Sequence, residues 1–417
     1  MNITNPPLGI DPFEDPVDRL LAEIAFSIQL PPSLHQKAVD RYEAVRKYLE
    51  STSSVFKDQI EYFYPQGSMS IDATISTKGT DDEYDLDIIA QLGDRFRGMT
   101  PLQILKELEA ALKGYQGLKV VRQTRCVTLY YKDGMHLDIS PSIREVDTPD
   151  RQSHICHAKG PEASIKDHMV PTNAFGFCQW YQQQTPVEQR VVESYGKRWN
   201  ALNETIFRAD ADVDEVPEPT AFVVKNTATL ALQIHKRFRN IQFADSSGRT
   251  APSILLSYYA ASAARPNTSL TDMVIRLAGF MITDIENASL YGRLINVCNP
   301  CHDRDIFTDR WPQNIHQQSD YAKKLKDFVA GLEVLKGGQM EPPRMMEWMR
   351  EQFGSHVVTR AADTIADQIG DSIKNSSQQY TRTGKVIIPT ATTTASVVRS
   401  SKAVASGRNH TFYGKKI

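Results

Sequence analysis

Residues 66–92 read QGSMSIDATISTKGTDDEYDLDIIAQL, and this stretch decides the fold. Its second half contains Asp85-Leu-Asp87-Ile-Ile, which alternates charged and apolar residues as a strand does. The period-2 geometry of a strand puts the carboxylates of Asp85 and Asp87 on one face and the apolar side chains on the other. Two like charges held side by side raise one pKa strongly unless a cation lies between them. The pair therefore predicts a site for a divalent metal ion.

A third carboxylate lies on a predicted hairpin further along the chain. Residues 128–131 and 135–139 have strand composition, and the Lys-Asp-Gly between them is a strong hairpin signal. Asp138 falls on the polar side of the second strand, opposite Leu137 and Ile139. We expect Asp138 to join the carboxylate pair.

A phosphate-binding turn is predicted upstream of the carboxylates. Gly67 and Ser68 follow a strand at 61–64 and begin a short helix. The free N–H groups and the dipole at the start of a helix attract phosphate, and glycine lets the backbone approach the anion closely.

The order of these parts resembles that of the DNA polymerase beta-like nucleotidyltransferase superfamily. Within it, the chain is most similar to the bacterial cGAS/DncV-like nucleotidyltransferases, the CD-NTases of CBASS anti-phage systems. Three motifs carry this resemblance, namely Gln-Gly-Ser-Met-Ser at 66–70, Asp-Leu-Asp-Ile-Ile at 85–89 and Leu-Asp-Ile-Ser-Pro-Ser at 137–142. The resemblance spans residues 33–353 and is sharpest in these motifs.

The resemblance implies a magnesium-dependent enzyme that makes a cyclic di- or trinucleotide from NTPs, ATP among them. Two Mg²⁺ ions would be bound by Asp85, Asp87 and Asp138, bridge the donor triphosphate and activate the attacking ribose hydroxyl. Gly67 and Ser68 would hold the phosphates.

The resemblance also implies that a helical domain closes on the triphosphate. Lys236 and Ser253 would make these contacts, and Lys236→Ala is expected to weaken NTP binding with little change in melting temperature. Ser257 is an alternative to Ser253, and capping of a helix is a second reading of Ser253. The basic end of the predicted helix, at 235–239, has the alternative reading of compensation for the helix dipole. Arg122 and Arg125 either face the site or are surface charges on an edge strand.

We predict an α+β fold, with a polymerase beta-like sheet domain packed on a helical C-terminal domain. The expected parts are an N-terminal lead-in and helix (1–32), the catalytic domain with a long first helix (33–150), a helical domain (151–370) and a flexible, basic, disordered tail (371–417). Apolar spacing predicts helices at 18–30, 34–49, 101–113, within 172–200, and at 220–241, 253–264, 270–287, 321–336 and 344–353. Residues 209–219 predict an acidic, exposed loop.

Composition limits the class of protein. The chain has 417 residues, 41% of them hydrophobic, which is enough for two packed domains. A formal net charge of -2 argues against a protein that coats long nucleic acid, and the sequence shows neither a secretory signal nor a membrane span. We expect a cytoplasmic enzyme. The rival hypothesis is another nucleotidyltransferase of the superfamily, one that modifies RNA ends or a protein.

Cysteines and histidines raise the alternative of a zinc site. The five cysteines are scattered, as in a reducing compartment. Cys298, Cys301, His302 and His316 fit no standard zinc-finger spacing, and neither do His154, Cys156 and His157, so we predict no zinc.

The tail is a candidate docking segment. Residues 372–417 contain eight Lys or Arg and no Asp or Glu, with apolar islands at 386–389 and 411–417. In the family that the chain resembles, HORMA-domain or ubiquitin-transfer-like proteins act on the synthase. Such a protein is the expected partner of the tail.

Overall fold

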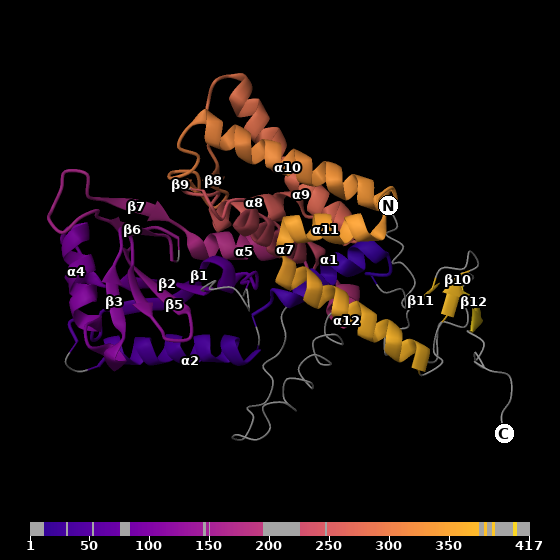
Figure 1. Cartoon of the computed structure of the whole chain (residues 1–417). Helices are drawn as coiled ribbons and strands as arrows, with labels where there is room; N and C mark the ends of the chain where they lie inside the picture. The colour runs from indigo at the N-terminus through magenta and orange to yellow at the C-terminus, as the bar shows by residue number, and fades with distance from the viewer. Residues whose placement is uncertain are drawn as a thin grey trace.

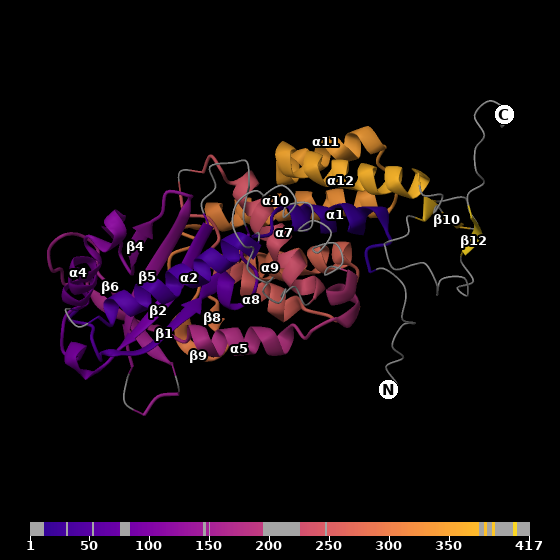
Figure 2. The ribbon, with the colours of Figure 1, turned by 90° about the horizontal axis from the view of Figure 1, so that it is seen from below.

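The computed structural model describes residues 12–30, 32–51, 54–75, 84–144, 147–149, 151–194, 226–246, 248–374, 379–381, 386–387 and 403–406. A sheet with its covering helices forms one half of the molecule, and a bundle of helices forms the other (Figures 1 and 2). This arrangement confirms the predicted α+β fold. None of the described helices combines the length and the apolar composition needed to cross a membrane.

The sheet contains seven strands. Five of them lie in the order β1 (Ile60–Gln66), β2 (Tyr84–Leu92), β5 (Met135–Ile143), β4 (Val127–Tyr130) and β3 (Lys119–Arg122), and β6 (Ser153–His157) and β7 (His168–Thr172) extend it from β5. The central pair β2 and β5 is parallel, whereas the neighbouring pairs are antiparallel. The predicted hairpin at 128–139 is therefore confirmed as β4 and β5.

Two helices cover the apolar face of the sheet. They are α2 (Pro32–Leu49) and α4 (Pro101–Leu112), and their apolar side chains share one core with Leu86, Ile88 and Leu137 of the central strands. Helix α4 starts with the capping box of Thr100 and Gln103, as Thr100 followed by proline predicts. Because this core holds the apolar face of β2, the carboxylates of that strand point to the opposite face.

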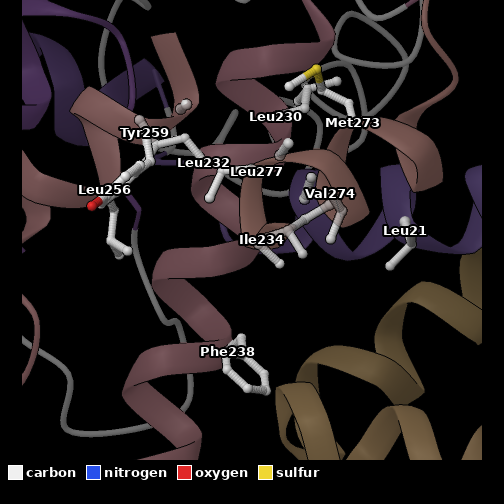
Figure 3. Close-up of a cluster of buried hydrophobic side chains, with 14 of the residues drawn as sticks. Leu21, Leu230, Leu232, Ile234, Phe238, Leu256, Tyr259, Met273, Val274 and Leu277 are labelled. Atoms are coloured by element: carbon white, nitrogen blue, oxygen red, sulfur yellow. The ribbon is translucent and has the colours of Figure 1, made fainter. Parts of the chain in front are cut away.

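The helical half has a second core. Its helices are α1 (Pro16–Ser27), α5 (Ala174–Gln184), α7 (Thr227–Gln242), α8 (Ser253–Ala263), α9 (Leu270–Leu290), α10 (Ile315–Lys336), α11 (Pro342–Phe353) and α12 (Ser355–Lys374). Figure 3 shows Leu21, Ile234 and Val274 in one cluster, although they come from α1, α7 and α9. The N-terminal helix thus packs among helices that follow it by some 200 residues in the sequence.

Several boundaries differ from the prediction. The sheet continues past residue 150, because β6 pairs with the end of β5 and β7 pairs with β6. Helix α7 starts at Thr227, where the side chain of Asn226 caps it, and the predicted first residues 220–225 lie outside the described part. The acidic loop predicted at 209–219 also lies outside it. Helix α12 is not predicted at all.

The break between helices near residue 300 contains a small hairpin. It consists of β8 (Cys298–Asn299) and β9 (His302–Ile306), which pair in antiparallel fashion. The strands are too short for sequence periodicity to reveal. Their position matters because residues 305–307 and 309–311 line the site described below.

Most of the predicted tail lies outside the described residues. Its described part consists of the end of α12 and three short strands, β10 (Gln379–Thr381), β11 (Val386–Ile387) and β12 (Ala403–Ser406). They form a separate antiparallel sheet in the order β11-β10-β12. The β-branched residues Val386 and Ile387 favour strand pairing.

Candidate active site

A cleft of about 760 Å³ is lined by both halves of the molecule. The sheet half contributes Asp85 and Asp87 of β2 together with α3 (Gly67–Ser70), the four-residue helix that follows β1. The helical half contributes Lys236 of α7, Ser253 of α8 and the segment that follows β9. The structure thus brings the predicted site residues of both halves to one cleft, except that Asp138 is not among the lining residues and lies beside Asp87 in the sheet.

The carboxylates are placed by the register of the parallel strands. Asp87 of β2 lies directly opposite Asp138 of β5, and Asp85 precedes Asp87 by two residues on the same face. The hydroxyl of Thr128 donates a hydrogen bond of 2.6 Å to Asp138 and so fixes one carboxylate oxygen. Burial, followed by the charges of Asp138 and Asp85, raises the pKa of Asp87 to about 7. The three carboxylates repel one another, as the sequence predicts.

The donor set suits magnesium, which prefers oxygen ligands. Within the described ranges, no three Asp, Glu, His or Cys side chains converge closely enough to enclose an ion by themselves. Magnesium in such sites often uses only one or two carboxylates and completes its shell with water and substrate phosphates. Asp85, Asp87 and Asp138 therefore fit an ion that is bound together with a triphosphate.

Gly67 is required for the close approach of the phosphate turn to the metal strand. Strand pairing places Gln66 opposite Asp87, so the turn begins beside that carboxylate. Gly67 has a φ of +63°, and a Cβ atom there would lie 2.6 Å from Oδ2 of Asp87. A side chain at this position would therefore be strained and would displace either the turn or the carboxylate.

Lys236 is more deeply buried than the prediction assumes. Its side chain is 4% exposed, and Nζ donates a hydrogen bond of 2.8 Å to the carbonyl oxygen of Ala73, in the segment that follows α3. Burial, then the nearby Arg239, lowers the pKa of Lys236 to about 7, while Asp87 and Asp85 oppose this shift. Lys236 therefore lines the cleft and also ties the helical half to the phosphate turn.

This contact changes the expected effect of Lys236→Ala. We expect both a lower melting temperature and a KM for NTP that rises about tenfold or more, because one hydrogen bond from a charged group stabilises by roughly 1.5–3 kcal/mol. The matched control is Lys324→Ala, which removes a lysine that donates to the carbonyl of Gln242 away from the cleft. Lys324→Ala should lower the melting temperature alone. Equal KM values in both variants would leave Lys236 a purely structural role.

Ser253 contacts an arginine. It is the first residue of α8, whose cap is Pro252 without a side-chain hydrogen bond, so Ser253 does not cap the helix as the alternative reading proposes. Its Oγ accepts a hydrogen bond of 3.1 Å from Arg239, and it lines the cleft. Ser257 also lines the cleft, but its hydroxyl donates to the carbonyl of Ser253, one turn back. The assignment of either serine to phosphate stays a prediction.

The other basic residues have different surroundings. Arg125 lines the cleft, whereas Arg122 donates to the carbonyl of Gly160 and lies outside the lining. His235 and Arg237 are buried and contact the carbonyl oxygens of Val274 and Phe353. His235 and Arg237 are therefore held by hydrogen bonds within the helical core, and dipole compensation does not explain these two side chains.

The sequence misses four charged residues of the cleft, Arg249, Asp305, Asp309 and Arg310. Residues 305, 309 and 310 belong to the segment 299–311, which in the sequence is a break between helices and consistent with the helical domain of the family, but carries no sign that it lines the cleft. Arg249 follows a turn and has no motif around it. Only the fold brings them to the cleft.

The cysteines and histidines considered for zinc have other contacts. Cys301 donates to the carbonyl of Gly176, and the ring of His157 accepts a hydrogen bond of 3.1 Å from Arg125. Cys156 is buried in the core of the sheet. No cluster of metal-ligand type forms among these residues in the described ranges.

Known proteins match this chain over nearly its full length. Residues 17–168 match the Second Messenger Oligonucleotide or Dinucleotide Synthetase (SMODS) domain family. The cyclic dinucleotide synthase CdnG of Bradyrhizobium diazoefficiens is 44% identical over 97% of this chain and 96% of its own. A c-di-GMP synthase of Roseivirga ehrenbergii is 22% identical over 85% of this chain and 89% of its own.

Solved structures of known proteins have a similar fold. The CD-NTase CdnG of Bradyrhizobium diazoefficiens in complex with GTP superposes with a TM-score of 0.73, covering 84% of this chain and 99% of that one at 44% identity. The complex of CdnC with HORMA-deltaN from E. coli MS115-1 has the same fold, with a TM-score of 0.53 at 13% identity, over 81% of this chain and 97% of that one. The carboxylate cleft and the identity along the whole chain lead to one conclusion: the chain belongs to the CD-NTase family of nucleotidyltransferases.

Proposed function

We propose that this enzyme joins two NTPs into a cyclic dinucleotide in a magnesium-dependent reaction. The observation that carries the proposal is the position of Asp87 between the turn at Gly67 on one side and Asp138 on the other. A relative that is 44% identical is called a cyclic dinucleotide synthase, which supports this product over a trinucleotide.

Each part of the site has a role in such a reaction. Asp85, Asp87 and Asp138 would hold the magnesium, which when bound neutralises phosphate charge and lowers the pKa of the attacking hydroxyl. The backbone at Gly67 and Ser68 binds phosphate of the donor nucleotide, since no side chain at residue 67 blocks it. Thr128 holds Asp138 in one orientation, and the link from Lys236 to Ala73 keeps the phosphate turn in place.

GTP is the substrate that the comparisons favour. The structure of the 44% identical relative is a complex with GTP, and a second relative is called a c-di-GMP synthase. Use of ATP, a role of the product in anti-phage defence, a cytoplasmic location and a HORMA-domain or ubiquitin-transfer-like partner at residues 371–417 remain predictions of the family resemblance.

The experiment that tests the proposal is product analysis. Purified protein is incubated with the four NTPs and Mg²⁺, treated with phosphatase and examined by mass spectrometry. We expect a phosphatase-resistant cyclic dinucleotide that contains guanine and forms only when Mg²⁺ is present. Labelling of added RNA or protein without any cyclic product would favour the rival nucleotidyltransferase activity.

A further inference from the structure

Besides Arg239, three arginines line the cleft, namely Arg125, Arg249 and Arg310. Arg125 precedes β4, Arg249 precedes α8, and Arg310 follows β9. Arg125 forms an ion pair with Asp309, and its Nε donates to the ring of His157. Asp305 also lines the cleft, and its carboxylate accepts hydrogen bonds from the backbone N–H of Asn173 and the side chain of Asn299. Three guanidinium groups against the carboxylates of Asp309 and Asp305 leave a net positive charge in this part of the cleft.

Two of these arginines lack a partner of their own. In the part of the chain that the structure describes, the side chains of Arg249 and Arg310 make neither a hydrogen bond nor an ion pair. Arg310 is partly buried, and burial together with the charges of Arg125 and Arg249 lowers its pKa. Mutual repulsion of partly desolvated cations is unfavourable unless an anion joins them, and guanidinium groups suit phosphate oxygens.

The arginines lie on the flank of the catalytic strands away from the phosphate turn. The sheet order is β1-β2-β5-β4, so α3, which follows β1, lies beyond β2, and Arg125, which precedes β4, lies beyond β5. Thr128 of β4 contacts Asp138 from the same flank.

The charges around the cleft follow this division. The charged groups that influence the pKa of Lys236 are Arg239, Asp87 and Asp85. The groups that influence the pKa of Arg310 are different ones, namely Arg125, Arg249, Asp309 and Cys126. The arginines thus form a second group of positive charge in the cleft, on the flank of Asp138.

We propose that Arg125, Arg249 and Arg310 bind the 5′-phosphates of the accepting nucleotide, while the turn at Gly67 binds those of the donor. This inference rests on the proposed function, because only a reaction between two nucleotides needs two phosphate sites in one cleft. The phosphates of the acceptor take no part in the bond that forms. Their binding positions the ribose hydroxyl and selects a nucleotide over a nucleoside as the first acceptor.

The test separates donor from acceptor. Labelled 2′,3′-dideoxy-GTP can donate but has no hydroxyl to accept, and either GTP or guanosine is supplied as acceptor. We expect Arg310→Ala to raise the KM for acceptor GTP at least about tenfold, with the KM for the labelled donor and kcat/KM for guanosine unchanged. Arg304→Ala, an exposed arginine of β9 outside the cleft lining, should leave all three values unchanged.

The same assay contains the results that would overturn the inference. An unaltered preference for GTP over guanosine in Arg310→Ala would do so, and so would an equal loss for donor and acceptor. The linear dinucleotide is supplied as substrate to measure ring closure by itself. A defect limited to this step would mean that the arginines bind the linear intermediate, and it would also overturn the inference.

A binding measurement covers the case in which the wild type makes no dinucleotide. Calorimetry with inorganic tripolyphosphate in EDTA removes any contribution of metal, and the carboxylates beside Gly67 then repel the anion. We expect the Kd to rise at least about tenfold in the double variant Arg249→Ala with Arg310→Ala. An unchanged Kd would refute the anion site, whatever the reaction of the enzyme. If the wild type made no cyclic dinucleotide but bound tripolyphosphate through these arginines, the proposed function would be wrong and the anion site would stand.

Discussion

The double variant Asp85→Asn with Asp87→Asn is expected to incorporate nucleotide at less than about one-hundredth of the wild-type rate while it remains folded. The two carboxylates line the cleft, and Asp87 lies beside Asp138 in the strand register. Their removal takes away charge that would hold magnesium and leaves the apolar face of β2 intact. The rate is measured as release of pyrophosphate from GTP. The control is Asp363→Asn with Asp367→Asn, two exposed residues of α12, which should retain full activity.

The single variant Asp87→Asn is expected to change stability in a pH-dependent way. The pKa of Asp87 is about 7 in the folded protein and 3.8 in the unfolded reference, so the folded state binds the proton more tightly. The contribution of this group to stability is therefore present below pH 4 and is lost as the pH rises towards 7. In metal-free buffer, the melting temperature of Asp87→Asn should exceed that of the wild type by a margin that grows from pH 4 to pH 7. A margin that shrinks over this range would contradict the repulsion among the three carboxylates.

Gly67→Ala is expected to reduce activity as severely as loss of a metal ligand. A Cβ atom at this position meets Oδ2 of Asp87 at 2.6 Å, so either the phosphate turn or the carboxylate must move. The left-handed backbone, with a φ of +63°, adds a strain of about 1–2 kcal/mol for any residue with a Cβ.

A variant at a second glycine separates the effect of backbone strain from the effect of the contact with Asp87. Gly292 has a φ of +64°, but a Cβ there would meet nothing within 4 Å. Gly292→Ala should therefore lose similar stability and keep its activity, with both read from melting curves and from kcat with GTP. If Gly67→Ala kept kcat within twofold of the wild type, the turn would not depend on close contact with Asp87.

The central part of the site is predictable because its information is local. Three features each depend on only a few neighbouring residues. They are the alternation of charged and apolar residues around Asp85 and Asp87, the hairpin before Asp138, and the glycine at residue 67. Strand geometry alone then decides which face the carboxylates share.

The rest of the site depends on contacts between distant segments. The hydrogen bond from Lys236 to Ala73 joins residues 163 positions apart, and the pair of Arg125 with Asp309 joins residues 184 positions apart. No local sequence pattern predicts contacts between residues so far apart in the chain. Burial of Lys236 therefore cannot be seen in the sequence, where the residue only belongs to a basic run at the end of a helix.

The errors in the fold have similar causes. Strands β6 and β7 contain His154, His157, His168 and Pro171 in place of a regular apolar alternation, so they do not stand out as strands. They belong to the sheet because β5 offers an edge for pairing. Helix α12 carries its buried residues Val357, Val358 and Ala361 near its start, and the polar remainder resembles the tail that follows.

The measurement that tests the central claim most directly is metal binding at the three carboxylates. Manganese, whose unpaired electrons make it visible to electron paramagnetic resonance, replaces magnesium in a titration with a GTP analogue that cannot be cleaved between the α- and β-phosphates. The account predicts that wild-type protein with the analogue binds manganese more tightly than either the analogue or the protein alone. This gain should disappear in Asp85→Asn with Asp87→Asn and persist in Asp363→Asn with Asp367→Asn. Equal manganese binding by both double variants would contradict the claim that these carboxylates hold the catalytic metal.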